Sequence, residues 1–272
     1  MMDAIAKKIL AGETLDNVLI IDAHAHTDSF ATVEEMLAQM DRIGIDKACI
    51  SDCIGISYDC VRGNQELEKV LEAYPDRFYG YCIVNGNDPK EAARLLEKYL
   101  PMPGVIGAKL YPGEGYKQGH HNIALDDPRN DVVYDMVAEA GKCILSHTWY
   151  HGGYKAAPGK MRRGLERHPE LTIIVGHSGG VREGHYETMR MMEDYPNVYF
   201  DLTGTEFGEL WLRDLVQMTD TGRILYGSDL GFFDASPYIG KVGLAEIPEE
   251  TKRDIFGRNM QRLLDGLRNI RR

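Results

Sequence analysis

The strongest constraint on the fold is a regular alternation of short apolar runs with helical patterns. Eight runs rich in Val, Ile, Tyr and Cys recur along the 272 residues. Most are almost continuously apolar, which is typical of parallel strands covered on both faces. We predict strands at 18–26, 47–53, 79–85, 106–111, 143–148, 172–177, 198–203 and 224–229.

The segments between these strands carry helix signals. Thr32 and Glu35 form a capping box ahead of an apolar face. Asp88 followed by Pro89 is typical of an N-cap with proline in the first helical turn. Further helices are predicted at 131–140, 206–219 and 248–267, and an extra helix at 3–11 precedes the first strand.

Eight strands alternating with helices predict one closed (β/α)8 TIM barrel, which spans residues 1–272 as a single domain. A doubly wound open sheet is the alternative. That fold expects a glycine-rich phosphate turn after an early strand, but the first strand instead ends in Asp22-Ala23-His24-Ala25-His26.

The composition argues against several partners. Lys and Arg total 31 against 42 Asp and Glu, so the formal charge is −11. Such a surface repels phosphate backbones and anionic membranes, so we expect neither nucleic acid nor membrane as a partner. The N-terminal segment lacks a secretory apolar region, and the five cysteines lie mostly in apolar runs typical of reduced thiols, so we expect a cytoplasmic protein.

Unusual polar residues gather at the predicted strand ends. His24 and His26 have the same parity at the end of the first strand. The later strands contribute Lys109, His147, His177 and Asp229. In a barrel all of these lie on the C-terminal face, where active sites of this fold occur. One histidine at a strand end is usually a core or surface group, but four together with a carboxylate predict a metal site of the zinc type.

Motifs along nearly the whole chain carry a family resemblance. The main ones are IDAHAH (21–26), GAKLYP (107–112), HPELTIIVGHSGG (168–180) and ILYGSD (224–229). Further matches are YPDRFYGYCIVN (74–85), DDPRNDVVYDMVAEAGKCILSHT (126–148), YPNVYFDLTG (195–204) and IFGRNMQRLL (255–264). The chain resembles the amidohydrolase superfamily, in the branch of amidohydrolase-related hydrolases and aminocarboxymuconate-semialdehyde decarboxylase-like enzymes.

The resemblance implies specific roles for the strand-end residues. His24, His26, His147 and Asp229 match the residues that bind the metal, and Asp229 also acts as a catalytic group. His177 matches a catalytic histidine that is not a ligand when one metal is present. We predict one Zn²⁺ per chain, with Mn²⁺ or a second ion as alternatives, and the family suggests a homodimer.

Lys109 has two interpretations. In two-metal relatives a carboxylated lysine at this position bridges the ions and the His177 equivalent binds the second one. Because the surroundings are acidic, we instead predict an unmodified Lys109 that contacts the substrate or Asp229. We expect Asp22 to support the ligands or the polar core rather than to bind the metal itself, and Asp201 either to orient a ligand or to be a buried structural carboxylate.

The pocket rim departs from the family pattern, which puts the substrate in doubt rather than the metal. Tyr111 stands where the family often has histidine, and Gly231 stands where it often has proline. We predict that Lys109, Tyr111 and Trp149 bind a small-molecule substrate. His120, His121, His151 and His185 are weaker candidates for substrate contact.

A metal-bound site of this kind predicts hydrolysis. Zn²⁺ lowers the pKa of water from about 15.7 towards ~7, and His177 and Asp229 could stabilise an oxyanion and relay a proton. We therefore expect cleavage of an amide, lactone or ester. The alternative is non-oxidative decarboxylation of an unsaturated or aromatic acid, and a second alternative is a non-catalytic barrel that binds metal or ligand.

Overall fold

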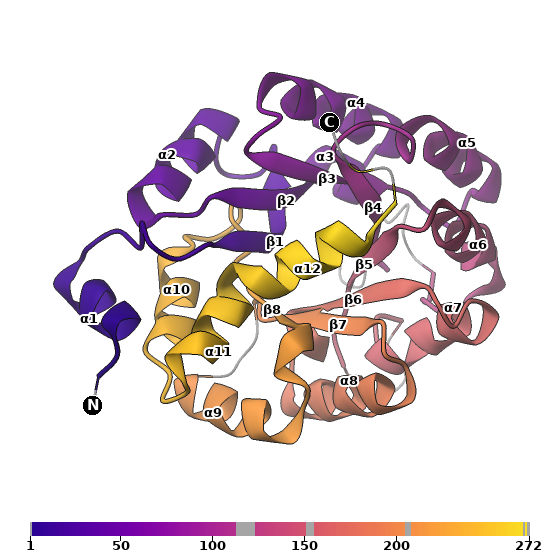
Figure 1. Cartoon of the computed structure of the whole chain (residues 1–272). Coiled ribbons are helices and arrows are strands. Elements are labelled where there is room, and N and C mark those ends of the chain that lie inside the picture. Colours follow the sequence, from indigo (N-terminus) through magenta and orange to yellow (C-terminus); the bar gives the residue numbers. More distant parts are fainter. Residues whose placement is uncertain (1, 113–122, 151–154, 205–207, 269, 271–272) are drawn as a thin grey trace.

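The eight strands form one parallel sheet in chain order, as the alternation predicts (Figure 1). The computed structural model describes residues 2–112, 123–150, 155–204, 208–268 and 270. The strands are β1 (Ile21–Thr27), β2 (Lys47–Asp52), β3 (Phe78–Ile83), β4 (Val105–Leu110), β5 (Cys143–His147), β6 (Thr172–Gly176), β7 (Val198–Asp201) and β8 (Ile224–Leu225). The fold is a (β/α)8 TIM barrel.

The last strand is shorter than the sequence predicts. β8 has two residues, and the chain then meets β1 through separate contacts rather than a regular ladder. The amide of Ala23 donates to Tyr226 O (2.9 Å), and the amide of Asp229 donates to His24 O (2.9 Å). These contacts join β8 to β1 and place Asp229 beside the histidines of the first strand.

Most of the helices pack around the outside of the sheet (Figure 1). The helices are α1 (Ala4–Ala11), α2 (Val33–Ile43), α3 (Cys53–Ser57), α4 (Cys60–Ala73), α5 (Pro89–Tyr99), α6 (Asp131–Ala140), α7 (Arg162–Arg167), α8 (Arg182–Asp194), α9 (Glu209–Met218), α10 (Ser236–Gly243), α11 (Glu249–Arg253) and α12 (Asn259–Gly266). The capping box of Thr32 and Glu35 is present, and Asp88 caps α5. The extra helix before β1 is confirmed as α1.

The predicted helix at 248–267 is interrupted. A π-helical turn, Asp254–Arg258, separates α11 from α12. Gly257 in this turn lies so close to the backbone of Leu19 that a Cβ atom there would meet Leu19 O at 2.4 Å. The wider turn and the missing side chain therefore let the segment pack against the residues that lead into β1.

α12 closes one end of the barrel. Met260, Leu263 and Leu264 are buried in the same cluster as strand residues from inside the barrel, such as Ile21 and Ile106. Figure 1 shows α12 lying across the strands. This apolar plug occupies the N-terminal end, so the polar residues can gather at the opposite end. Among the described residues, no helix combines the length and apolarity that a membrane crossing needs.

Candidate metal centre and active site

The two histidines of β1 each have one ring nitrogen committed to a partner. His24 Nδ1 lies 3.0 Å from Asp201 Oδ2, and His26 Nδ1 lies 3.2 Å from the carbonyl oxygen of Ser51. Because these oxygens accept, Nδ1 carries the proton in both rings. Burial lowers the pKa of both imidazoles, so both are neutral and present Nε2 as a lone-pair nitrogen.

Asp229 faces these lone pairs with an oxygen of its own. Its Oδ1 lies 3.3 Å from His26 Nε2 and 3.6 Å from His24 Nε2. Among the described residues this buried Oδ1 has no hydrogen-bond partner. Two lone-pair nitrogens thus face one carboxylate oxygen.

Such a convergence fits a cation. Neutral imidazole nitrogens and a carboxylate oxygen are ligands that zinc and manganese accept. Potential ligand atoms of His24, His177 and Asp229 lie within 4.8 Å of one another, a set that includes neither His26 nor His147. The residues present therefore fit a divalent ion, on the chemistry of the donors and on the unpartnered oxygen of Asp229.

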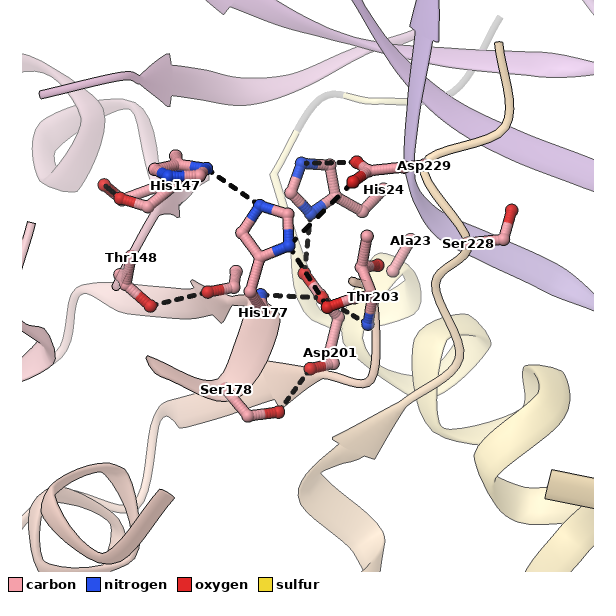
Figure 2. Close-up of polar contacts among 12 residues, drawn as sticks. Ala23, His24, His147, Thr148, His177, Ser178, Asp201, Thr203, Ser228 and Asp229 are labelled. Atoms are coloured by element: carbon pink, nitrogen blue, oxygen red, sulfur yellow. Dashed lines mark hydrogen bonds and ion pairs between the residues drawn. The ribbon is translucent and has the colours of Figure 1, made fainter. Parts of the chain in front are cut away.

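His147 and His177 are linked ring to ring (Figure 2). His177 Nδ1 lies 3.1 Å from the carbonyl oxygen of Thr203, which can only accept, so this nitrogen carries the proton. His177 Nε2 then accepts from His147 Nδ1 at 2.8 Å. Both nitrogens of His177 have partners, whereas His147 retains Nε2 as its lone-pair nitrogen.

Asp201, at the end of β7, connects the two sides of the site (Figure 2). One oxygen meets the ring of His24, and the other accepts from the backbone amide of His177 (3.0 Å) and from that of Thr203 (3.0 Å). His177 and Asp229 have φ angles of 61° and 56°, in the left-handed region that non-glycine residues rarely adopt. Asp201 helps to hold His177 in this conformation.

Asp22 ties β1 to the segment after β8. Its carboxylate accepts from the hydroxyl of Ser228 (2.5 Å) and from the backbone amide of His24 (3.0 Å). Burial raises the pKa of Asp22 to about 7. Asp201 therefore contacts the ring of His24, whereas Asp22 is a buried carboxylate that contacts the His24 backbone and Ser228.

Lys109 lies at the centre of the site. Its side chain is only 1% exposed, and burial lowers its pKa to about 8. Its Nζ lies 2.5 Å from His24 Nε2. The contact that the structure shows for Lys109 is thus with His24, not with Asp229.

Aromatic rings surround the histidines. The ring centroid of Tyr111 lies 4.7 Å from that of His147, and Trp149 stacks on His147 at 6.5 Å. Phe232 lies 4.9 Å from His26, and Phe30, which is 85% exposed, lies 6.0 Å from Phe232. Neither phenylalanine was among the predicted site residues. The available signal for Phe232 was its place three residues after Asp229.

The structure brings eight of the predicted site residues together at the C-terminal end of the barrel: His24, His26, Lys109, Tyr111, His147, Trp149, His177 and Asp229. His120, His121 and His151 lie outside the described residues. His185 is buried against Trp211, whose indole Nε1 donates to its Nδ1 at 2.6 Å.

Comparison with known proteins decides the family. Residues 21–266 match the amidohydrolase family model. The chain belongs to the amidohydrolase superfamily. Its curated relatives include γ-resorcylate decarboxylases from Polaromonas sp. (26% identical, 85% of this chain and 83% of the relative) and from Rhizobium sp. (26% identical, 75% and 76%).

Solved structures with the same fold include a 2,6-dihydroxybenzoate decarboxylase from Rhizobium, with a TM-score of 0.73, 18% identity and coverage of 91% of this chain and 99% of that one. Another is a dihydroxybenzoic acid decarboxylase from Polaromonas sp. with bound manganese and the inhibitor 2-nitroresorcinol, with a TM-score of 0.73, 19% identity and coverage of 91% and 97%.

These findings correct the predicted reaction. The expectation of a hydrolase is wrong, because the relatives are decarboxylases and so favour the carboxy-lyase alternative. The physical reason for the error is that one set of histidines and aspartate serves both reactions. Zinc as the main ion is not confirmed, since the Polaromonas structure holds manganese.

Proposed function

We propose that this protein is a metal-dependent, non-oxidative decarboxylase of an aromatic acid. The observation that carries the metal centre is the position of His24 Nε2 and His26 Nε2, which lie 3.6 Å and 3.3 Å from Asp229 Oδ1. The γ-resorcylate decarboxylases among the relatives support the choice of reaction.

We assign His24, His26, His147 and Asp229 as the residues that hold one divalent ion, manganese or zinc. Each imidazole has its proton on Nδ1, held by Asp201, Ser51 and His177 respectively. Such partners fix ring orientation and raise ligand basicity. When bound, the ion supplies a Lewis acid that withdraws charge from an oxygen of the substrate.

The reaction needs one proton and no redox partner. The bond between the ring carbon and the carboxylate breaks, carbon dioxide leaves, and the ring carbon takes up a proton. His177 Nδ1 lies 3.9 Å from Asp229 Oδ2. We assign these two residues as the pair that holds the proton and delivers it from Asp229 to the ring carbon.

The aromatic surroundings favour a planar substrate. Tyr111 and Trp149 flank His147 on one side, and Phe232 flanks His26 on the other. Aromatic pairs contribute about 0.5–1.5 kcal/mol beyond burial of their surface. A hydroxybenzoate suits both the rings and the cationic centre. We keep Tyr111, Trp149 and Lys109 as proposed substrate contacts and add Phe232.

The test is a labelled turnover experiment. The purified protein, loaded with Mn²⁺ or Zn²⁺, is given 2,6-dihydroxybenzoate and related hydroxybenzoates with a ¹³C carboxylate in D2O. We expect labelled carbon dioxide and a product with one deuteron on the ring. A parallel panel of lactones, esters and amides should remain intact. Hydrolysis of that panel with no carbon dioxide from any acid would refute the proposal.

A further inference from the structure

Lys109 and a metal ion would need the same atom of His24. Asp201 holds the proton on His24 Nδ1, so Nε2 offers the lone pair of that ring. Lys109 Nζ lies 2.5 Å from this nitrogen. One lone pair serves one partner, so His24 cannot accept from lysine and ligate an ion at the same time.

The contact does not depend on the charge of the lysine. An ammonium and a neutral amine both carry N–H groups that can donate to an imidazole nitrogen. Both side chains are fully buried, and Asp201 fixes the His24 ring. Lys109 Nζ is therefore a donor beside the three acceptor atoms, His24 Nε2, His26 Nε2 and Asp229 Oδ1.

We propose that Lys109 is a built-in competitor for the metal centre. Its N–H donates to His24 Nε2, the nitrogen that an ion at this centre would need. An incoming ion must displace it from that nitrogen. This inference rests on the metal centre of the proposed function, but it concerns ion binding and not the reaction.

Removing the competitor should strengthen ion binding. Met approximates the length of the lysine stem and cannot donate, so Lys109→Met frees Nε2 of His24 with little loss of packing. We expect the dissociation constant of Mn²⁺, measured by calorimetry on metal-stripped protein, to fall roughly tenfold, the scale of one lost hydrogen bond. Lys109→Gln, which is shorter but retains N–H donors, should give a smaller change.

Lys142→Met is the matched control. Lys142 is also buried, but its Nζ donates to the carbonyl oxygen of Val105 and not to a site residue. We expect its Mn²⁺ affinity to equal that of the wild type. The thermal melting of each metal-free variant establishes that it is folded before titration.

Two outcomes would overturn the inference. The first is unchanged or weaker Mn²⁺ binding in a folded Lys109→Met variant. The second is a fall from two ions to one in that variant, together with a wild-type lysine that carries a carboxyl group by mass spectrometry. Failure of the decarboxylation assay with tighter ion binding in Lys109→Met would instead refute only the proposed reaction.

Discussion

The two ends of the barrel bury a lysine each, and the two lysines have different surroundings. Lys109 is 1% exposed and Lys142 is 3% exposed, and burial lowers the pKa of each to about 8. Lys142 precedes β5 at the end that α12 closes, and it meets a backbone carbonyl. Lys109 meets His24 beside Asp229 at the open end.

The comparison shows which observation marks a functional site. Burial and a lowered pKa are common to both lysines, so neither property separates a site from a structural position. What differs is the environment: the C-terminal end gathers lone-pair nitrogens and an unpartnered carboxylate oxygen, whereas the N-terminal end gathers Met260, Leu263 and Leu264. Converging acceptors are therefore the stronger evidence for function.

The largest effects should come from the ligands at the open end. His24→Ala removes a ligand nitrogen, and Asp229→Asn removes the negative charge of the ligand oxygen, so we expect loss of the bound ion and loss of decarboxylation by ~10³-fold or more. Elemental analysis after dialysis and a turnover assay check this. His168→Ala is the control, because His168 is a partly buried histidine that contacts Asp135 away from the site. An ion retained by both ligand variants would contradict the assignment.

A His177 variant tests whether this residue is a catalytic group or a metal ligand. Both of its nitrogens have protein partners, so His177→Asn should retain one ion and lose activity by ~10²–10⁴-fold, as expected for an acid–base group. The ratio of ion to chain and the turnover number measure the two effects separately. If the variant instead loses an ion from a two-ion protein, His177 is a ligand and the one-ion assignment is wrong.

The closed end should affect stability and not chemistry. Leu263 is buried in the apolar plug, and Leu263→Ala should cost about 2–5 kcal/mol of unfolding free energy through the cavity that it leaves. Urea unfolding measures the loss. Turnover per folded molecule and the ion content should equal those of the wild type. A change in metal affinity would mean that the two ends are coupled through the barrel.

The sequence predicted the barrel because each strand is a local apolar pattern. The predicted last strand, 224–229, is longer than the observed β8, which ends at Leu225. The composition of this run suits a strand, but Asp229 has a left-handed φ, which a strand does not allow. The contact of His24 with Asp201 joins residues 177 positions apart, so no local spacing could assign the ring protons. The type of reaction could not be predicted from the sequence, because the same ligand types serve hydrolysis and decarboxylation.

The smallest effect tests the lysine of the closed end. Its pKa is lowered from 10.5 to about 8 in the folded chain. Below pH 8 both states hold the proton, and the buried ammonium lowers stability. Between pH 8 and 10.5 the unfolded chain holds more protons than the folded one, so wild-type stability rises with pH. Lys142→Met lacks this group, so the excess of its unfolding free energy over that of the wild type should shrink by about 2–3 kcal/mol from pH 7 to pH 10.

Urea unfolding at the two pH values measures this difference. Lys7→Met, at an exposed position of α1, is the control for loss of a surface charge. If the difference in unfolding free energy between the wild type and Lys142→Met does not change with pH, the Lys142 ammonium is solvated. The two lysines would then not share a pKa lowered by burial.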